Sequence, residues 1–284
     1  MQKIIGGAFF MPNSQLMKSY FTQIFLFVLV FNIQLEAQVI ATEVLQHAHA
    51  HNDYNKFNPL WDALENGCAS IEIDVFATDD ELKVAHIKLC LSKKPSLSRS
   101  YLLPLQKIIQ ERGFIYPNQA LVLMIDFKSN SEISLHLLEE AIRSMKDLFT
   151  YYHNGEVVEK YLKLVISGAG IQYQQLEKMD TIYFFKDGSV SNCAQDFPES
   201  LVPRGSASYG SQFNWNGKKE MPEDELLKLR SMVTEASNCN KKLRFYAMPA
   251  KEKIWLKFLE EGVYWINVDQ PKKFKSFNNS VITH

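Results

Sequence analysis

Histidines and carboxylates capable of acid/base and metal chemistry are concentrated between residues 47 and 86. HAHAHNDY contains His51 as its third histidine, SIEIDV contains Glu72 and Asp74, and LKVAH ends at His86. A neutral imidazole and a protonated one can act as general base and general acid, each typically contributing a factor of about 10²–10⁴. We therefore predict that His51 and His86 form an acid/base pair.

Glu72 and Asp74 are predicted metal ligands. Successive side chains in a strand alternate between faces, so these two carboxylates point to one side while Ile71 and Ile73 point to the other. Two buried carboxylates are costly unless a divalent cation neutralises them, and their oxygen atoms suit Mg²⁺ or Ca²⁺. Asp126, which closes the apolar run ALVLMID, is the predicted third ligand.

Three further residues are expected near these groups. Lys128 stands two residues beyond Asp126, on the same face of the predicted strand, where it provides a cation for an anionic substrate. His47 and His49 share a face with His51 in a period-two register. We expect these two histidines either to support the site or to line its mouth.

Short β-rich runs alternate with longer amphipathic runs from about residue 43 onward, which is typical of βα units around a parallel sheet. Roughly eight strands over about 245 residues predict a single TIM-type (β/α)8 barrel, with the site at the carboxyl ends of its strands. An open doubly wound sheet is the alternative, but no GxGxxG turn follows the first strand. The predicted strands are 43–49, 70–77, 82–86, 120–127, 163–168, 181–185, 243–249 and 263–269, and the main predicted helices are 59–67, 101–113, 132–149, 221–236 and 251–262.

The N-terminal region contains the one long apolar run of the sequence, YFTQIFLFVLVFNI. Residues 17–37 combine a basic start, an apolar core and a small-residue end, so we predict a secretory signal peptide. Residues 1–16 fit an over-extended start, and the barrel domain is expected over 38–284. This prediction implies a secreted or periplasmic protein with no stable membrane span once the signal is removed; an uncleaved anchor is the alternative.

The bulk composition fits a globular protein that does not bind nucleic acid. The chain has 284 residues, 46% of them hydrophobic, and a formal net charge of −1, with no concentrated basic footprint. The runs KKPSLSR and QPKKFK are interpreted as solvated surface. The four cysteines are too widely spaced for a CxxC metal cluster, although disulfides remain open. LVPRGS at 201–206 matches a protease site used in expression vectors, and we interpret it as native sequence.

The same residues carry a family resemblance. The stretch from HNDY through SIEIDVFATDDELKVAH resembles the opening of the phospholipase C-like phosphodiesterase superfamily, which includes the glycerophosphodiester phosphodiesterases. HNDY, PLWDALENGC, RFYAMP and GVYWINVD are most similar to the altered-inheritance-of-mitochondria branch and its bacterial relatives. The resemblance extends over effectively the whole predicted mature chain.

The resemblance implies a metal-dependent phosphoric diester hydrolase acting on a glycerophosphodiester or a phospholipid head group. It makes His51 and His86 the acid/base pair and Glu72, Asp74 and Asp126 the ligands of a divalent cation. It assigns substrate binding to Lys128 and Asn52.

Three positions depart from the pattern of the glycerophosphodiesterases. HND stands where His-Arg-Gly is usual, so one phosphate-binding arginine is missing, and HIK replaces the usual His-Asp after the second histidine. The aromatic residue usual in the last strand but one is Phe245 or Tyr246, while Trp265 comes one strand later.

Two other functions compete with this one. The HAH sequence also resembles the His-x-His metal pair of amidohydrolase barrels, which bind zinc or another transition metal through imidazoles. That class needs more histidine ligands on later strands, whereas His136 and His153 are predicted in or beside a helix. A non-catalytic lipid- or phosphate-binding barrel is the second alternative, although simple binding does not require an acid/base pair.

Overall fold

The computed structural model describes residues 40–190, 193 and 197–282. The predicted signal peptide and the sixteen residues before it lie outside the described residues, and so do residues 38 and 39 at the predicted start of the mature chain. Within the described ranges, no helix has both the length and the apolar character needed to cross a membrane.

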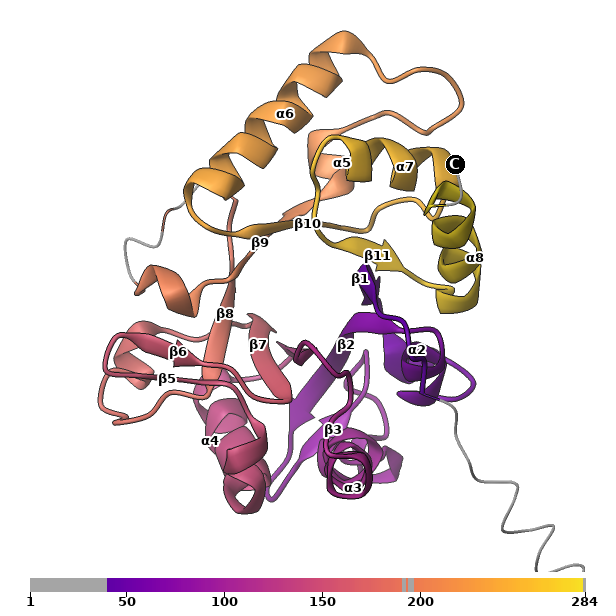
Figure 1. Cartoon of the computed structure of the whole chain (residues 1–284). Coiled ribbons are helices and arrows are strands. Elements are labelled where there is room, and N and C mark those ends of the chain that lie inside the picture. The colour runs from indigo at the N-terminus through magenta and orange to yellow at the C-terminus, as the bar shows by residue number, and fades with distance from the viewer. Residues whose placement is uncertain (1–39, 191–192, 194–196, 283–284) are drawn as a thin grey trace, which may run out of the picture. The chain divides into compact units, whose positions relative to one another are not determined.

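Eight parallel strands form the ring of a TIM-type barrel, as predicted (Figure 1). Seven neighbouring pairs run in the order β10-β9-β8-β7-β4-β2-β1-β11. The ring closes through a parallel bridge between Arg244 and Trp265, where the Trp265 amide donates to the Leu243 carbonyl over 2.9 Å. The strands are β1 (Leu45–Ala50), β2 (Cys68–Ala77), β4 (Leu121–Phe127), β7 (Leu162–Gly168), β8 (Phe184–Gly188), β9 (Arg204–Ser208), β10 (Lys242–Tyr246) and β11 (Ile266–Val268).

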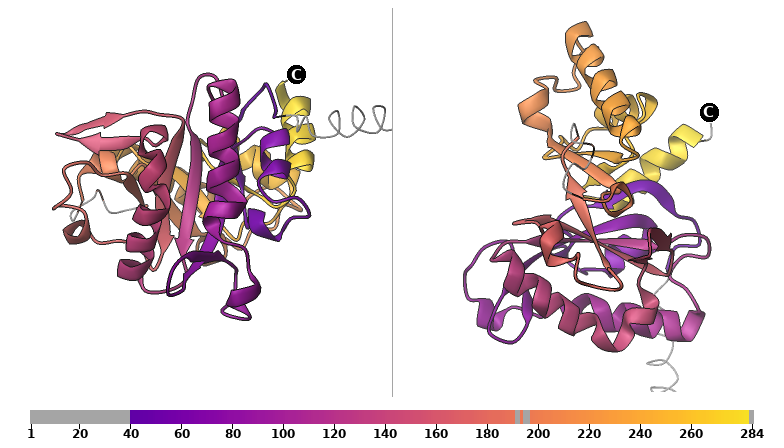
Figure 2. Two further views of the ribbon diagram at one scale, coloured as in Figure 1. Left: turned by 90° about the horizontal axis from the view of Figure 1, so that it is seen from below. Right: turned by 90° about the vertical axis from the view of Figure 1, so that its left-hand side faces the viewer.

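Helices connect the strands and pack outside the ring; α3 and α4 run along its outer side (Figure 2). Gly67 and Gly113 have φ angles of +75° and +83° just beyond α2 and α3, where a residue without a Cβ costs least. The helices are α2 (Trp61–Glu65), α3 (Leu103–Arg112), α4 (Ser131–Ile142), α5 (Tyr209–Gln212), α6 (Glu223–Asn238), α7 (Glu252–Glu260) and α8 (Pro271–Ile282).

One predicted strand lies outside the ring. LKVAH forms β3 (Leu82–Val84), which pairs antiparallel with the end of β2 as a hairpin. A second hairpin, β5 (Tyr151–His153) with β6 (Glu156–Val158), also stands apart from the barrel sheet. The sequence prediction counted the first of these hairpins as a barrel strand, which is wrong, because its residues turn back on β2 instead of crossing over.

The sequence analysis missed one strand of the barrel, β9. Its residues RGSAS are one arginine followed by four small residues, and none is of the β-branched or aromatic types that mark strands. Arg204 is 1% exposed, and its guanidinium stacks over the Trp265 ring at 4.5 Å. The LVPRGS segment therefore contributes a barrel strand, which agrees with its interpretation as native sequence.

A disulfide joins Cys193 to Cys239, which follows α6. Cys68 is a buried free thiol in β2, and Cys90 is free and exposed. The pairing could not be chosen from the sequence, because four cysteines allow three connectivities.

Candidate active site

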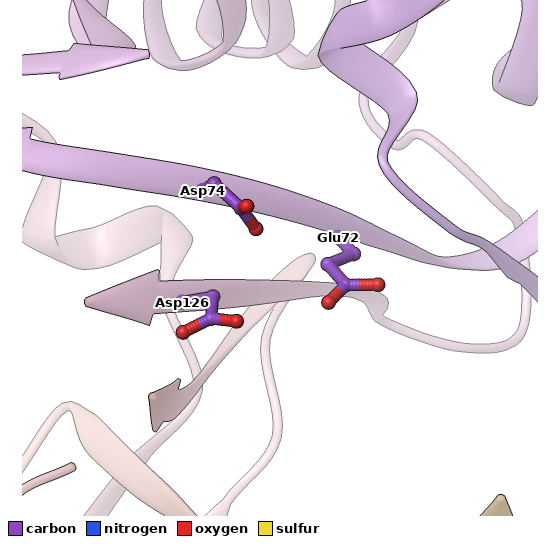
Figure 3. A group of neighbouring side chains, drawn as sticks. All are labelled: Glu72, Asp74 and Asp126. Carbon is purple, nitrogen blue, oxygen red and sulfur yellow. The ribbon is translucent and has the colours of Figure 1, made fainter. Parts of the chain in front are cut away.

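The three predicted metal ligands lie together at the carboxyl end of the barrel (Figure 3). β2 and β4 are adjacent parallel strands whose register places Asp74 directly opposite Asp126. Glu72 is two residues earlier on β2, and one oxygen atom from each carboxylate lies within 4.8 Å of the others. The alternation of faces in SIEIDV therefore works as predicted, with Ile71 and Ile73 fully buried on the other face.

The free oxygen atoms of this cluster suit a hard divalent cation. Oδ2 of Asp74 and Oδ2 of Asp126 accept hydrogen bonds from protein groups, whereas Oδ1 of each is buried without a hydrogen-bond partner. A buried, ionised oxygen without a donor is costly unless a cation neutralises it. Oxygen-only ligands of this kind are typical of Mg²⁺ and Ca²⁺ sites.

Glu72 is held ionised by a buried arginine. Arg244 on β10, 3% exposed, donates from Nη2 to Glu72 Oε2 over 3.0 Å and from Nε to Asn267 Oδ1 over 2.8 Å. Burial alone would raise the pKa of Glu72, but the charge of Arg244 and the contact with His49 hold it well below its usual value. The carboxylate is thus charged and fixed in place before any cation arrives.

Lys128 bridges the other two carboxylates. Its Nζ lies 2.8 Å from Asp126 Oδ2 and 3.1 Å from Asp74 Oδ2. Partial burial works against the charged amine, but these two carboxylates more than offset it and raise the lysine pKa. Asp126 is affected mainly by burial, which raises its pKa, and Lys128 opposes that rise. The ammonium has one more N–H, and the side chain is 27% exposed, so it can also contact an incoming anion.

His51 follows β1 and is oriented by Asp269, the residue after β11. Its Nδ1 lies 2.8 Å from Asp269 Oδ1, so the ring donates there and keeps Nε2 as the nitrogen that can exchange a proton. Nε2 lies 3.8 Å from Glu72 Oε2, on the side of the acidic cluster. The hydrogen bond with His51 lowers the pKa of Asp269.

His86 follows β3 and is oriented by Asp74 and Tyr54. Its Nδ1 donates to Asp74 Oδ2 over 2.9 Å, and the Tyr54 hydroxyl lies 3.1 Å from the same nitrogen. Tyr54 also donates to Asp74 Oδ2 over 2.7 Å; burial, followed by this bond, raises the tyrosine pKa. These contacts orient the ring, although Ile87 stands where an aspartate usually follows the second histidine. His86 Nε2 remains available at a side chain that is 58% exposed.

Asn52 and Asp53 shape the loop that carries His51 and Tyr54. Asn52 has a φ of +48°, a conformation that asparagine tolerates, and its Oδ1 lies 2.8 Å from the Tyr54 hydroxyl. Asp53 is fully buried and accepts from the Leu60 amide over 2.6 Å and from the Tyr101 hydroxyl over 2.8 Å. Burial raises the pKa of Asp53 to about 6.

The remaining histidines of HAHAH have different positions. His49 is buried inside the ring, with Nδ1 2.8 Å from the Ser70 hydroxyl and Nε2 3.4 Å from Glu72 Oε2, so it supports the site from below. Burial, followed by the charge of Arg244, lowers its pKa. His47 bonds to the Tyr264 carbonyl, which precedes β11, and therefore lies toward the opposite end of the barrel.

The aromatic positions of RFYAMP also separate. Phe245 is fully buried outside the ring, where it packs edge-on against Phe213 and Phe258. Tyr246, at the end of β10, shares a face with Arg244 and is 44% exposed. Trp265 lies under Arg204 in the barrel interior and is 4% exposed.

The histidine pattern of an amidohydrolase is not assembled. Within the described ranges, the one group able to hold a metal consists of three carboxylates and contains no imidazole. His136 is on α4, and His153 is on β5, bonded to the Asp180 carbonyl. Neither extends the HAH pair into a metal site.

Three site residues were missed by the sequence analysis. Tyr54 stands in HNDY and Asp269 ends GVYWINVD, but neither residue type indicates a contact across the barrel. Arg244 had no signal of its own, because an arginine in a short strand ordinarily indicates an exposed position. The indirect signal was the acidic centre of the predicted barrel, because buried carboxylates need a positively charged side chain that faces inward.

Known proteins are similar to this chain in the region that carries most of the site. Residues 37–115 match the model of the AIM6-like phosphodiesterase domain, a span that contains both histidines and two of the three carboxylates. The resemblance inferred from the sequence is confirmed. An altered inheritance of mitochondria protein 6 homolog of Arthroderma benhamiae is 24% identical over 260 residues, covering 81% of this chain and 82% of that protein. Altered inheritance of mitochondria protein 6 of Eremothecium gossypii is 26% identical over 266 residues, covering 80% and 68%.

A solved structure supports the fold. A phosphodiesterase of Oleispira antarctica, in complex with the product sn-glycerol-3-phosphate, aligns with a TM-score of 0.50 and 14% identity, covering 82% of this chain and 96% of that chain. At this identity the alignment bears on architecture alone. The family match over residues 37–115 is to a phosphodiesterase domain.

Proposed function

We propose that this protein is a metal-dependent phosphoric diester hydrolase that acts on glycerophosphodiesters or on phospholipid head groups. The observation that carries the proposal is a pair of carboxylate-bound imidazoles beside one acidic cluster. His51 is paired with Asp269 and His86 with Asp74, while Glu72 and Asp126 complete the cluster. Simple phosphate binding does not need two oriented proton carriers.

In the proposed reaction the two histidines exchange protons with the substrate. One imidazole Nε2 takes the proton of the attacking oxygen, which belongs to water or to a neighbouring substrate hydroxyl. The other imidazolium protonates the alkoxide that leaves phosphorus. Both Nδ1 atoms donate to carboxylates, which stabilise the positive charge that each ring carries during its part of the cycle.

Glu72, Asp74 and Asp126 would hold the divalent cation, Mg²⁺ or Ca²⁺. When bound, it supplies positive charge against the phosphodiester oxygens. Lys128 adds a second positive charge next to this cluster, and Asn52 is placed on the His51 loop, where its amide can bind the substrate. The Oleispira antarctica phosphodiesterase holds sn-glycerol-3-phosphate as its product, which supports glycerophosphodiesters as the substrate class.

The predicted signal peptide supports a secreted or periplasmic site of action. In such a compartment the Cys193–Cys239 disulfide would persist.

Turnover of bis(p-nitrophenyl) phosphate and of glycerophosphodiesters tests the proposal. The wild type, His51→Ala and Glu72→Ala are compared before and after EDTA treatment, and Lys107→Ala on α3 is the control for an exposed charge away from the site. We expect strong losses in the two site variants, an EDTA-sensitive wild type, and an unaffected control. Unchanged turnover in both site variants would reject the site, and EDTA-insensitive turnover would reject the cation.

A further inference from the structure

The segment from residue 86 to residue 99, HIKLCLSKKPSLSR, is basic and apolar at once. It contains Lys88, Lys93, Lys94 and Arg99 and has no aspartate or glutamate. Ile87 and Leu89 are 58% and 62% exposed, and the three lysines are exposed as well. The sequence alone indicated only a solvated basic run, because the exposure of the two apolar side chains could not be seen.

This segment forms a loop between β3 and α3 (Figure 1) that is tied down at its base. The Val84 amide donates to the Pro95 carbonyl over 2.9 Å, and Lys83 forms a bridge with Ser96. The loop begins at His86, so its exposed apolar residues directly follow a proposed acid/base group. It therefore lies at the mouth of the barrel.

The neighbouring loop, which carries His51, also has an exposed apolar side chain. Phe57 follows His51 in the chain, is fully exposed and is next to Lys56. The two loops touch, because the Tyr54 hydroxyl lies 3.1 Å from His86 Nδ1. Each loop that carries a proposed acid/base histidine thus presents an exposed apolar side chain beside a lysine.

The base of the 86–99 segment encloses a polar hollow of about 410 Å³. Lys93, Lys94 and Arg99 line it together with Lys83, whose ammonium is paired with Glu81. Glu81 also lines the hollow and interacts with the charge of Arg99, but its ion pair is with Lys83; within the described residues, no carboxylate lies within 4.0 Å of the charged nitrogen atoms of Lys93, Lys94 or Arg99. The hollow is thus lined by four basic side chains and one acidic one. The hollow therefore offers positive charge to an anion such as a phosphate.

We propose that the 86–99 segment and Phe57 dock the mouth of the barrel onto an anionic phospholipid surface. Ile87, Leu89 and Phe57 enter the boundary between head groups and acyl chains, while the lysines and Arg99 face lipid phosphates. Apolar burial combined with attraction to anionic lipid is the usual basis of peripheral membrane binding. This inference rests on the proposed function only in making the bound lipid the substrate; the surface itself is independent of catalysis.

Vesicle sedimentation tests the docking surface in the full chain. The probes are vesicles of phosphatidylcholine alone and of phosphatidylcholine mixed with phosphatidylglycerol. We expect binding to the mixed vesicles that weakens with added salt, and little binding to phosphatidylcholine alone. The Ile87→Ser/Leu89→Ser and Lys93→Gln/Lys94→Gln variants should each bind the mixed vesicles roughly tenfold or more weakly. Leu227→Ser, an equally exposed apolar position on α6, is the matched control and should bind like the wild type.

Turnover separates this inference from the proposed function. The docking variants should hydrolyse a water-soluble glycerophosphodiester at the wild-type rate and lose turnover of phospholipid in vesicles. Wild-type protein that ignores mixed vesicles, or docking variants that bind them as the wild type does, would overturn the docking surface and leave the proposed function standing. A wild type that binds vesicles but cleaves no phosphodiester would overturn the proposed function instead.

Discussion

His51 Nδ1 and Asp269 Oδ1 lie 2.8 Å apart, although 218 positions separate these residues in the chain. The pairing of the first and last strands of the barrel makes this contact possible, because β1 and β11 are adjacent and parallel and the two residues follow their carboxyl ends. A carboxylate on Nδ1 fixes the tautomer of the ring and makes Nε2 a better proton acceptor.

Replacing Asp269 by asparagine should lower kcat/KM for a glycerophosphodiester by roughly tenfold to a hundredfold, because the ring loses its orienting charge. Since Asp269 is half-exposed, the free energy of unfolding measured in urea should change little. Steady-state kinetics across pH, compared with Asp180→Asn at an exposed turn, provide the measurement. A variant with wild-type kcat/KM at every pH would show that Asp269 does not act on His51.

Loss of Arg244 should destabilise the barrel strongly. Arg244→Met leaves Glu72 as a buried carboxylate without its main partner, and removing one member of such a pair costs about 3–5 kcal/mol. The Glu72→Gln/Arg244→Met double variant should recover part of that loss. Urea unfolding measures both, and Lys107→Met, which removes one end of an exposed ion pair, should be nearly neutral. A single variant as stable as the wild type would contradict the pairing.

Gly168 should be required for the position of Asp126. A Cβ at Gly168, which ends β7, would fall 1.9 Å from Asp126 Oδ1, and the residue has a φ of +72°. Gly168→Ala should therefore weaken Mg²⁺ or Ca²⁺ binding, measured by calorimetric titration, by roughly tenfold or more.

Gly113→Ala is the matched control for that substitution. Gly113 has a φ of +83° and no atom within 4 Å of an added Cβ, so this variant carries similar backbone strain without displacing a ligand. Equal cation affinity in the two glycine variants would argue against the role of Asp126.

Asp53 should make stability depend on pH. Its pKa is raised from 3.8 to about 6 by burial, so between these values the folded state binds more protons than the unfolded state. The free energy of unfolding should then fall as pH rises from about 4 to about 6, by up to roughly 3 kcal/mol from this group. Asp53→Asn should show a shallower fall in urea unfolding across this range. Identical pH dependence in the two proteins would refute this effect of Asp53.

The fold and the acidic cluster could be predicted because they depend on local patterns. The alternation in SIEIDV places Glu72 and Asp74 on one face, and Asp126 follows the apolar run LVLMI near the end of β4. β9 could not be predicted, because RGSAS has no strand propensity of its own. It forms a strand only because it fills the position between β8 and β10 in the ring. The orientation of His86 was equally hidden, since Tyr54 reaches it from another loop.

Phosphorus NMR of a glycerophosphodiester incubated with the protein tests the central claim most directly, because it follows the bond that the site is proposed to break. With Mg²⁺ or Ca²⁺ present, the wild type should convert the diester signal into that of a monoester or of a cyclic phosphate that later opens. His51→Ala and His86→Ala should leave most of the diester intact over the same period. A diester signal that persists with the wild type, or disappears equally fast with both histidine variants, would contradict the account.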